Sequence, residues 1–353
     1  MKTPDPTIPV RASEALDETA LTTYLRGQAP AMGNLLEIRQ FPGGFSNLTY
    51  CLHTSTGAYV LRRPPFGANI KGGHDMGREY RVLSLLQGHY DKIPRPIVFC
   101  DDESVLGAPF YVMECLEGNI LRPANALKMA LAPAVLRQAS EALVDNLVAL
   151  HRLDIHHTGL AALGKPEGYV QRQVAGWIKR YYNAQTDDLQ DMKTIEDWLL
   201  AHPPRAQAPA FLHNDYKYDN VVFQPDNWTH IIGVLDWEMA TVGDPLMDLG
   251  ATLAYWIEPT DSAFARQLNS TWLPGNLSRQ EVIERYAAQS GRDLSDILFY
   301  YVFGLYKNTV IAQQIYARWK KGYTQDPRFG ELIGVIRDFA AKGVGALAKG
   351  EVQ

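Results

Sequence analysis

The chain has 353 residues, of which 46% are hydrophobic and 21% are charged, and its 34 Lys+Arg and 39 Asp+Glu give a formal net charge of −5. This composition is typical of a folded globular protein and excludes a disordered or collagen-like chain. At roughly 100–200 residues per domain, the length predicts two domains or lobes. The mild acidity offers no basic surface for a phosphate backbone, so we expect no nucleic-acid partner.

The cysteines and the apolar runs indicate the cellular compartment in which the protein is expected. Cys51, Cys100 and Cys115 have neither CxxC spacing nor an even count, so they predict no disulfide framework and no zinc site, and they fit a reducing compartment. The N-terminal segment carries proline and acidic residues where a secretory signal needs an apolar stretch, and the apolar run at 297–306 is too short to cross a bilayer. We therefore expect a cytoplasmic protein with no membrane partner.

The N-terminal part of the chain is predicted to form short strands. Residues 35–41 and 49–54 flank a glycine-containing loop, as in a β-hairpin, and residues 58–63 supply a third strand. Over 76–89 the apolar residues recur at helical spacing, with Glu79 beside the apolar stripe. This part is therefore expected to contain a sheet and a helix that carries a carboxylate.

A strand pair at 97–99 and 110–114, around an acidic turn, completes the predicted sheet. Beyond it, the apolar residues recur mainly at helical spacing. We therefore predict an α+β protein. Its first domain, residues 1–115, holds an antiparallel sheet and one key helix, and its second domain, residues 116–353, is mainly helical.

The helical pattern is interrupted once, by β-rich runs at 211–223 and 231–235. Helices are predicted to resume at Asp244, which forms an N-cap pattern with Pro245. Residues 293–321 predict a long, largely buried helix or helix pair. The interruption is also where polar residues gather most densely.

Residues 213–220 combine a histidine, two aspartates, a lysine and two asparagines between the β-rich runs. If residues 221–223 and 231–235 pair as an antiparallel hairpin, Asn220 and Asp236 lie side by side at its open end. An amide oxygen beside a carboxylate suits Mg²⁺, which completes its octahedron with water and substrate phosphates. The sequence therefore predicts a magnesium site at Asn220 and Asp236.

Asp215 stays available for another role in the same segment. A carboxylate that reaches a substrate hydroxyl orients it and accepts its proton during phosphoryl transfer, and Lys217 would neutralise the migrating group. Each residue also has a structural alternative: a turn cap for Asp215, a left-handed conformation for Asn220 and core packing for His213. A second acidic cluster downstream favours the functional interpretation.

Together these segments resemble the aminoglycoside phosphotransferase and choline kinase superfamily. Residues 213–220 match its HxDxxxxN catalytic loop. The residues that match its metal-site pattern are Asp236, Gly243, Asp244, Asp248 and Leu249. The strings GGFSN, VLRRPP and LDWEMATVGDPL look most like the phosphotransferase domain fused to some acyl-CoA dehydrogenases. The resemblance implies a two-lobed, protein-kinase-like fold with a small β-rich N-lobe and a larger helical C-lobe.

The resemblance also implies roles for residues of the N-terminal part. Arg62 stands where the superfamily has a lysine that holds the α- and β-phosphates, and Glu79 matches the helix carboxylate that pairs with it. The planar fork of arginine changes the geometry of this pair. Backbone groups of Glu114 and Leu116 would meet the adenine. The residues that match the phosphate loop are Gly43, Gly44, Phe45, Ser46 and Asn47.

The implied activity is that of a small-molecule kinase that uses ATP and Mg²⁺ and transfers the γ-phosphoryl group to a hydroxyl. Asp215 would orient and deprotonate that hydroxyl, Lys217 would stabilise the charge in transit, and His213 would hold the loop in shape. In the branch fused to acyl-CoA dehydrogenases the acceptor is thought to be a hydroxyacyl-CoA. Aminoglycoside, sugar and choline-like acceptors stay open, because related folds use the same chemistry on all of them.

Two alternative functions stay open. A protein kinase is less favoured, because the GxGxxG, DFG and APE motifs are absent from the sequence. A catalytically silent nucleotide-binding or regulatory module belongs to another class of function. Retention of Asp215, Asn220 and Asp236 argues against it, whereas arginine in place of lysine at position 62 leaves it open.

Overall fold

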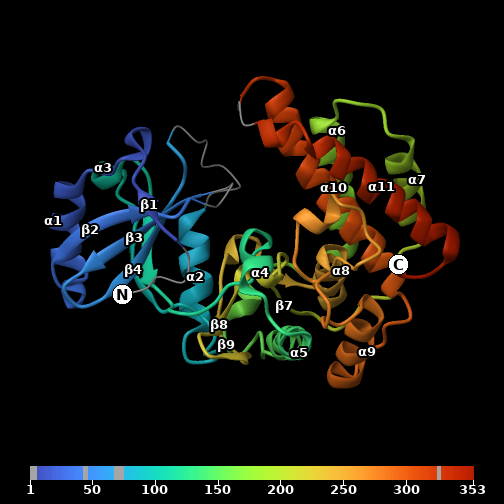
Figure 1. Cartoon of the computed structure of the whole chain (residues 1–353), viewed down its shortest axis with the longest axis horizontal. Coiled ribbons are helices and arrows are strands. Elements are labelled where there is room, and N and C mark those ends of the chain that lie inside the picture. The colour runs from blue at the N-terminus through green and yellow to red at the C-terminus, as the bar shows by residue number, and fades with distance from the viewer. Residues whose placement is uncertain (1–5, 43–46, 67–74, 324–326) are drawn as a thin grey trace. The chain divides into compact units, whose positions relative to one another are not determined.

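The computed structural model describes residues 6–42, 47–66, 75–323 and 327–353. They form two compact units, Met1–Ile120 with Asn220–Ala240 and Leu121–Asp219 with Thr241–Gln353 (Figure 1). The first unit therefore takes in residues 220–240, which lie far beyond the predicted domain boundary at residue 115. Within the described ranges, no helix is long and apolar enough to cross a membrane.

The first unit is built on a six-stranded antiparallel sheet with the order β1-β2-β3-β4-β6-β5. Its strands are β1 (Ile8–Pro9), β2 (Leu35–Gln40), β3 (Leu48–Thr54), β4 (Ala58–Arg63), β5 (Pro96–Cys100) and β6 (Phe110–Glu114). Its helices are α1 (Glu18–Gln28), α2 (Met76–Leu86) and α3 (Glu103–Leu106). The predicted strands and the predicted helix of this region are therefore present, and the acidic turn contains the short helix α3, which Asp102 caps through the Ser104 N–H.

The alternation of side chains along β4 separates a core face from a functional face. Leu61 is fully buried in the hydrophobic core that includes Leu21 and Leu25 of α1. Arg62, the next residue, points to the opposite face of the sheet, because side chains alternate along a strand, and there it contacts Glu79 of α2. The sheet thereby carries a buried cation on the face that α2 covers.

Strands β8 (Val221–Gln224) and β9 (Asn227–Val234) form the antiparallel hairpin of the first unit. Val221 pairs with Val234, and the Leu235 N–H donates to the Asn220 carbonyl at 2.8 Å. The predicted pairing is thus confirmed, and it places the backbones of Asn220 and Asp236 next to each other at the open end of the hairpin.

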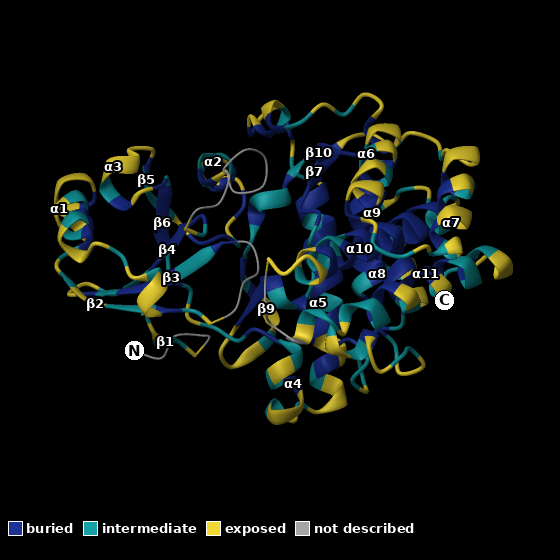
Figure 2. Cartoon of the chain, turned by 90° about the horizontal axis from the view of Figure 1, so that it is seen from above, coloured by how far each residue is buried: buried dark blue, intermediate teal, exposed yellow. Residues whose placement is uncertain are grey.

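The second unit is mainly helical. Its helices are α4 (Pro123–Met129), α5 (Pro133–His151), α6 (Tyr169–Ala184), α7 (Gln190–Ala201), α8 (Pro245–Tyr255), α9 (Arg279–Ser290), α10 (Ile297–Lys320) and α11 (Leu332–Lys349). Figure 2 shows α8 and α10 largely in the colour of buried residues. They cross at two glycines: a Cβ on Gly250 would lie 2.1 Å from the Tyr300 carbonyl oxygen, and a Cβ on Gly304 would lie 2.3 Å from the Gly250 carbonyl oxygen.

The β-rich run predicted at 211–223 is wrong in its middle part. Strand β7 (Ala210–Leu212) ends at Leu212 and pairs with β10 (Thr241–Gly243), and residues 213–220 form a loop with a short 3₁₀ turn. The physical reason is that the loop's backbone and polar side chains hydrogen-bond to side chains of neighbouring helices instead of to a strand. The predicted helix at Asp244 is present, with Asp244 as its N-cap.

Candidate functional site

Asp248 of α8 anchors the start of the polar loop in the second unit. Its carboxylate is fully buried and accepts the backbone N–H of His213 at 2.6 Å and that of Asn214 at 2.8 Å. His151 Nε2 donates to the same carboxylate at 3.2 Å. Burial alone would raise the pKa of Asp248, but the hydrogen bonds from His151 and the His213 N–H outweigh it and lower the pKa. The carboxylate is therefore held ionised as a scaffold for the loop.

Two buried tyrosines fix the rest of the loop. The Tyr216 hydroxyl donates to the Leu143 carbonyl at 2.9 Å, and the Thr252 hydroxyl donates to the Tyr216 carbonyl at 3.1 Å. The Tyr218 hydroxyl donates to Asn276 Oδ1 at 2.7 Å. Because these bonds reach three separate segments of the helical unit, the loop has little freedom to change conformation.

Asp215 lies between these anchors. Its N–H donates to His213 Nδ1 at 3.2 Å, so His213, which is fully buried, shapes the turn that presents the aspartate. The Lys217 ammonium donates to both carboxylate oxygens of Asp215, at 2.7 and 2.8 Å, and lies 4.5 Å from the centre of the Tyr255 ring. Burial alone would lower the pKa of Lys217, but the Asp215 carboxylate outweighs it and raises that pKa. The structure thus joins three predicted site residues: His213, Asp215 and Lys217.

We expect Asp248→Asn to lower the free energy of unfolding by about 3 kcal/mol. The amide N–H₂ group would face a backbone N–H that has lost its acceptor, and the substitution removes the charge that holds His151. Urea unfolding measures the change. Asp226→Asn is the matched control, since Asp226 is an exposed aspartate in the turn of the β8–β9 hairpin and should change stability by less than about 0.5 kcal/mol. Equal losses in both variants would contradict the scaffold role of Asp248.

In the first unit, Arg62 joins two carboxylates. Its guanidinium forms an ion pair with Glu79 of α2 and another with Asp236, at 3.0 Å. Burial alone would lower the pKa of Arg62, but Glu79 and Asp236 outweigh burial and raise it well above its usual value. Burial raises the pKa of Glu79, against the effect of Arg62. The arginine is therefore a permanent cation at a fixed position.

The oxygen-bearing side chains at the open end of the β8–β9 hairpin, Asn220 and Asp236, are of the kind that binds Mg²⁺. Asp236 adopts a left-handed conformation with φ 66°, and its carboxylate contacts Arg62. Glu79, Asp236 and Glu238 all act on Arg62, so the carboxylates outnumber the guanidinium and a divalent cation would balance the charge. Over the described residues, no group of three or more His, Cys, Asp or Glu could hold a metal, so Asn220 and Asp236 would need water and phosphate oxygens as further ligands.

The remaining predicted residues lie around this sheet. Asn47 is buried, and its side chain donates to Glu238 at 2.9 Å. The predicted loop residues Gly43, Gly44, Phe45 and Ser46 lie outside the described residues.

The predicted adenine-contact residues lie at the end of β6 and just after it. The Glu114 N–H donates to the Arg95 carbonyl at 2.9 Å. Leu116 packs against the hairpin, because a Cβ on Gly233 would lie 2.1 Å from Leu116 Cδ1. The adenine contacts of Glu114 and Leu116 stay predictions.

Sequence reasoning missed several polar residues around the loop, among them a buried lysine. Lys307 of α10 is 4% exposed, and its ammonium donates to the Asn214 carbonyl at 2.6 Å. The available signal was a lysine directly after the apolar run 297–306, within the helix that the sequence predicts to be largely buried.

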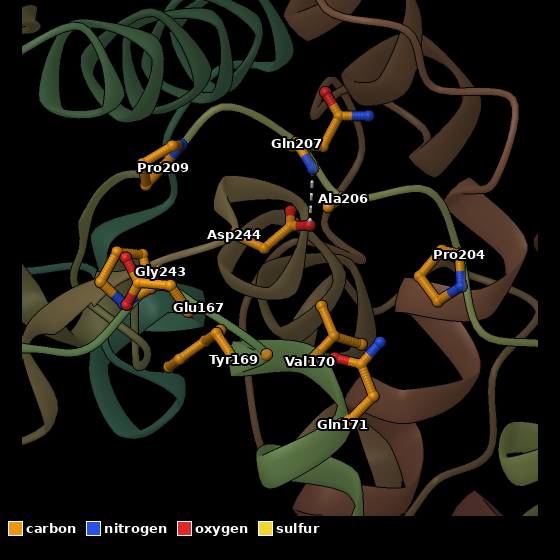
Figure 3. Close-up of a pocket in the computed structure, with 12 residues that line it drawn as sticks. Glu167, Tyr169, Val170, Gln171, Pro204, Ala206, Gln207, Pro209, Gly243 and Asp244 are labelled. Carbon is orange, nitrogen blue, oxygen red and sulfur yellow. Dashed lines mark hydrogen bonds between the residues drawn. The ribbon is translucent and has the colours of Figure 1, made fainter.

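A pocket of about 260 Å³ lies in the second unit, beside the N-terminus of α6 (Figure 3). Tyr169, Gln207 and Asp244 help to line it, and Figure 3 shows the Asp244 carboxylate directed at the Gln207 N–H, 3.3 Å away. Burial raises the pKa of Asp244. The Tyr169 hydroxyl accepts a hydrogen bond from the Asn214 side chain at 3.3 Å. Gly243 and Asp244, which match the metal-site pattern, line this pocket, but none of the residues predicted to act in catalysis, nucleotide binding or metal binding does.

Comparisons with known proteins identify the family of the chain. The family model described as "Phosphotransferase enzyme family" matches residues 37–283. Acyl-CoA dehydrogenase family member 11 from Gallus gallus is 31% identical over 345 residues, which cover 95% of this chain and 44% of that protein. The human member 11 is also 31% identical, with 93% of this chain and 42% of that protein covered. The chain therefore spans less than half the length of these relatives.

A solved structure extends the likeness to three dimensions. A Ralstonia eutropha JMP134 protein assigned as an aminoglycoside phosphotransferase is 29% identical and superposes with a TM-score of 0.80, covering 95% of this chain and 99% of that one. This likeness confirms the predicted α+β fold of the kinase-like phosphotransferases.

Proposed function

The chain belongs to the phosphotransferase enzyme family, and from that premise we propose that it is an ATP- and Mg²⁺-dependent small-molecule kinase. It transfers the γ-phosphoryl group of ATP to a hydroxyl. The observation that carries this proposal is the placement of Arg62 between Glu79 and Asp236. A buried cation that is held by a helix carboxylate and a hairpin carboxylate is suited to receive phosphate oxygens.

The first unit binds the nucleotide. Arg62 contacts the α- and β-phosphates, Glu79 fixes the arginine, and the backbone of Glu114 and Leu116 meets the adenine. Gly43, Gly44, Phe45, Ser46 and Asn47 would add contacts to the phosphates. Asn220 and Asp236 would hold the magnesium ion, which when bound neutralises charge on the β- and γ-phosphates.

The second unit prepares the acceptor. Asp215 accepts a hydrogen bond from the acceptor hydroxyl, aligns its oxygen with the γ-phosphorus and takes its proton as the new P–O bond forms. The bond from the γ-phosphorus to the bridging oxygen breaks in the same displacement, and ADP leaves. Lys217 stabilises the negative charge on the transferring group. His213 keeps the Asp215 backbone in the conformation that presents the carboxylate.

We propose that the acceptor is a hydroxyacyl-CoA or a sugar and not an aminoglycoside. The likeness to acyl-CoA dehydrogenase family member 11 supports the hydroxyacyl-CoA as the first of these acceptors to test. Lys217 and Lys307 both interact electrostatically with Asp215, but the carboxylates of Asp215, Asp219 and Asp248 balance their charges, so the charge at the base does not select the acceptor.

The test is an acceptor screen. Purified protein is incubated with Mg²⁺, γ-labelled ATP and four separate pools: hydroxyacyl-CoA esters, sugars, amino alcohols such as choline and homoserine, and aminoglycosides. We expect label to enter a molecule of the first or second pool, and no label to enter it with Asp215→Asn. Label in the aminoglycoside pool would contradict the acceptor class. Mg²⁺-dependent ATP binding without transfer to any pool would favour the silent nucleotide-binding module.

Arg62 gives a separate prediction. We expect Arg62→Met to lower kcat/KM for ATP by about a hundredfold, because it removes the cation at the phosphates and leaves Glu79 buried without its partner. Arg62→Lys keeps the charge and should retain more than about a tenth of the wild-type value. Steady-state kinetics with varied ATP measure both. Arg63→Lys, one residue along β4 on the other face of the sheet, is the control, and a wild-type value for Arg62→Met would contradict the role of Arg62.

A further inference from the structure

Helix α10 carries a charged residue in the interior of the helical unit. Lys307 is 4% exposed, and its neighbours in the helix, Tyr306 and Val310, are almost fully buried. A lysine is rarely buried to this extent without a polar partner, because its ammonium loses its hydration. Its position therefore calls for a specific interaction that offsets this cost.

The partner of Lys307 is the peptide that precedes the catalytic aspartate. Its ammonium donates to the Asn214 carbonyl at 2.6 Å, and the N–H of the same peptide, which belongs to Asp215, donates to His213 Nδ1 at 3.2 Å. The Asn214–Asp215 peptide is thus held at both ends. Asn214 itself has φ 65°, a left-handed conformation that costs free energy unless its surroundings hold it.

The charged and aromatic groups around Lys307 come from three other segments. Asp215 and Lys217 belong to the loop, Asp248 belongs to α8, and Arg180 belongs to α6. The ring of Trp177, also in α6, lies 5.8 Å from the ammonium. Among the residues that the structure describes, the Asn214 carbonyl is the hydrogen-bond acceptor of Lys307.

We propose that Lys307 is a positioning residue for Asp215, which acts by fixing the Asn214–Asp215 peptide and thereby the direction of the catalytic carboxylate. This inference rests on the proposed function, since it assumes that Asp215 receives the proton of the acceptor. Lys307 holds the carbonyl oxygen, His213 holds the N–H, and Asp248 holds the two preceding N–H groups. The loop then has one orientation in which the carboxylate is aligned for transfer.

Lys307 also makes this alignment depend on pH. Burial lowers the pKa of Lys307 to about 8, with Lys217 and Arg180 lowering it and Asp215 and Asp248 raising it. Below this pH the ammonium is charged and donates a strong hydrogen bond, and above it the neutral amine donates a weaker one. Activity that depends on Lys307 should therefore fall as the pH rises through about 8.

The test compares three variants by kinetics. With the best acceptor of the screen, Lys307→Met should lower kcat by about ten- to a hundredfold and leave KM for ATP within about twofold, because orientation is lost while nucleotide binding is not. Lys307→Arg should recover part of kcat and move the alkaline limb of the kcat profile to higher pH. Lys342→Met is the matched control: burial also lowers the pKa of Lys342 to about 8, but its partner is Asp261. It should leave kcat and the alkaline limb unchanged.

Hydrogen exchange tests the same inference without an acceptor. Exchange of the Asp215 amide, followed by mass spectrometry of peptides that cover 213–220, should be faster in Lys307→Met than in wild type and unchanged in Lys342→Met. Unchanged exchange, or a loss of kcat that the Lys342→Met control reproduces, would overturn the positioning role. If wild-type protein transfers the phosphoryl group no faster than Asp215→Asn, the proposed function is contradicted. The exchange result would still decide whether Lys307 holds the loop.

Discussion

Asp215→Asn is expected to lower kcat for phosphoryl transfer by about a thousandfold and to leave KM for ATP within about threefold of wild type. The amide has the shape of the carboxylate but cannot take a proton, and it loses the charge that Lys217 pairs with at 2.7 and 2.8 Å. Nucleotide binding is expected to persist because the phosphate-binding residues belong to the first unit. Steady-state kinetics with the acceptor identified in the screen measure both constants.

The control for this prediction is Glu284→Gln, a neutralised carboxylate on the exposed side of α9 in the same unit. It should retain wild-type kcat. A residual kcat above about a tenth of wild type in Asp215→Asn would exclude Asp215 as the base and leave it only a structural role in the loop.

Asp236→Asn is expected to lower Mg²⁺-dependent turnover by about a thousandfold, with a weaker apparent affinity for Mg²⁺ at fixed ATP. The substitution removes the charged oxygen of the proposed magnesium site, and it removes one of the two carboxylates that hold Arg62. Titration of Mg²⁺ in the transfer assay measures the change. Wild-type Mg²⁺ dependence in this variant would contradict the assignment of the hairpin as the metal site.

Asn220 provides a matched pair of variants for the same site. Asn220→Asp keeps an oxygen ligand at the entrance of β8 and should retain measurable Mg²⁺-dependent turnover. Asn220→Leu has a side chain of similar volume but no oxygen that could bind the metal, and it should behave like Asp236→Asn. Because the Leu235 N–H bonds to the backbone carbonyl of Asn220, neither substitution removes the pairing of the hairpin.

Periodicity and turn signals predicted the elements that carry the site. The strands of the first sheet and helix α2 occur where the sequence places them, and the antiparallel pairing of β8 with β9 was inferred from two short apolar runs. These features follow from local patterns, because alternation along a strand and spacing along a helix determine which side chains share a face. The contact of Arg62 with Glu79 follows from the same patterns together with the family resemblance.

The long-range contacts of the loop could not be predicted in the same way. The interaction of Asp248 with the N–H groups of residues 213 and 214 depends on how α8 crosses the helical unit, and the approach of α10 depends on two glycines at that crossing. Lys307 contacts Asn214 across 93 residues of sequence. Such contacts are set by tertiary packing, which no local pattern reports.

Part of the polar loop is wrongly predicted as strand, because its aromatic residues have high strand propensity. Its hydrogen bonds with side chains determine its actual conformation.

The measurement that tests the central claim most directly is a single-turnover reaction of γ-labelled ATP and Mg²⁺ with an excess of enzyme and the acceptor pool, followed by separation of inorganic phosphate from labelled organic product. The proposed function predicts that wild-type protein places the label on a hydroxyl of one small molecule, which mass spectrometry identifies, and that Asp215→Asn does not. Label found only in inorganic phosphate, or equal labelling by both proteins, would contradict a small-molecule kinase that uses Asp215 as its base.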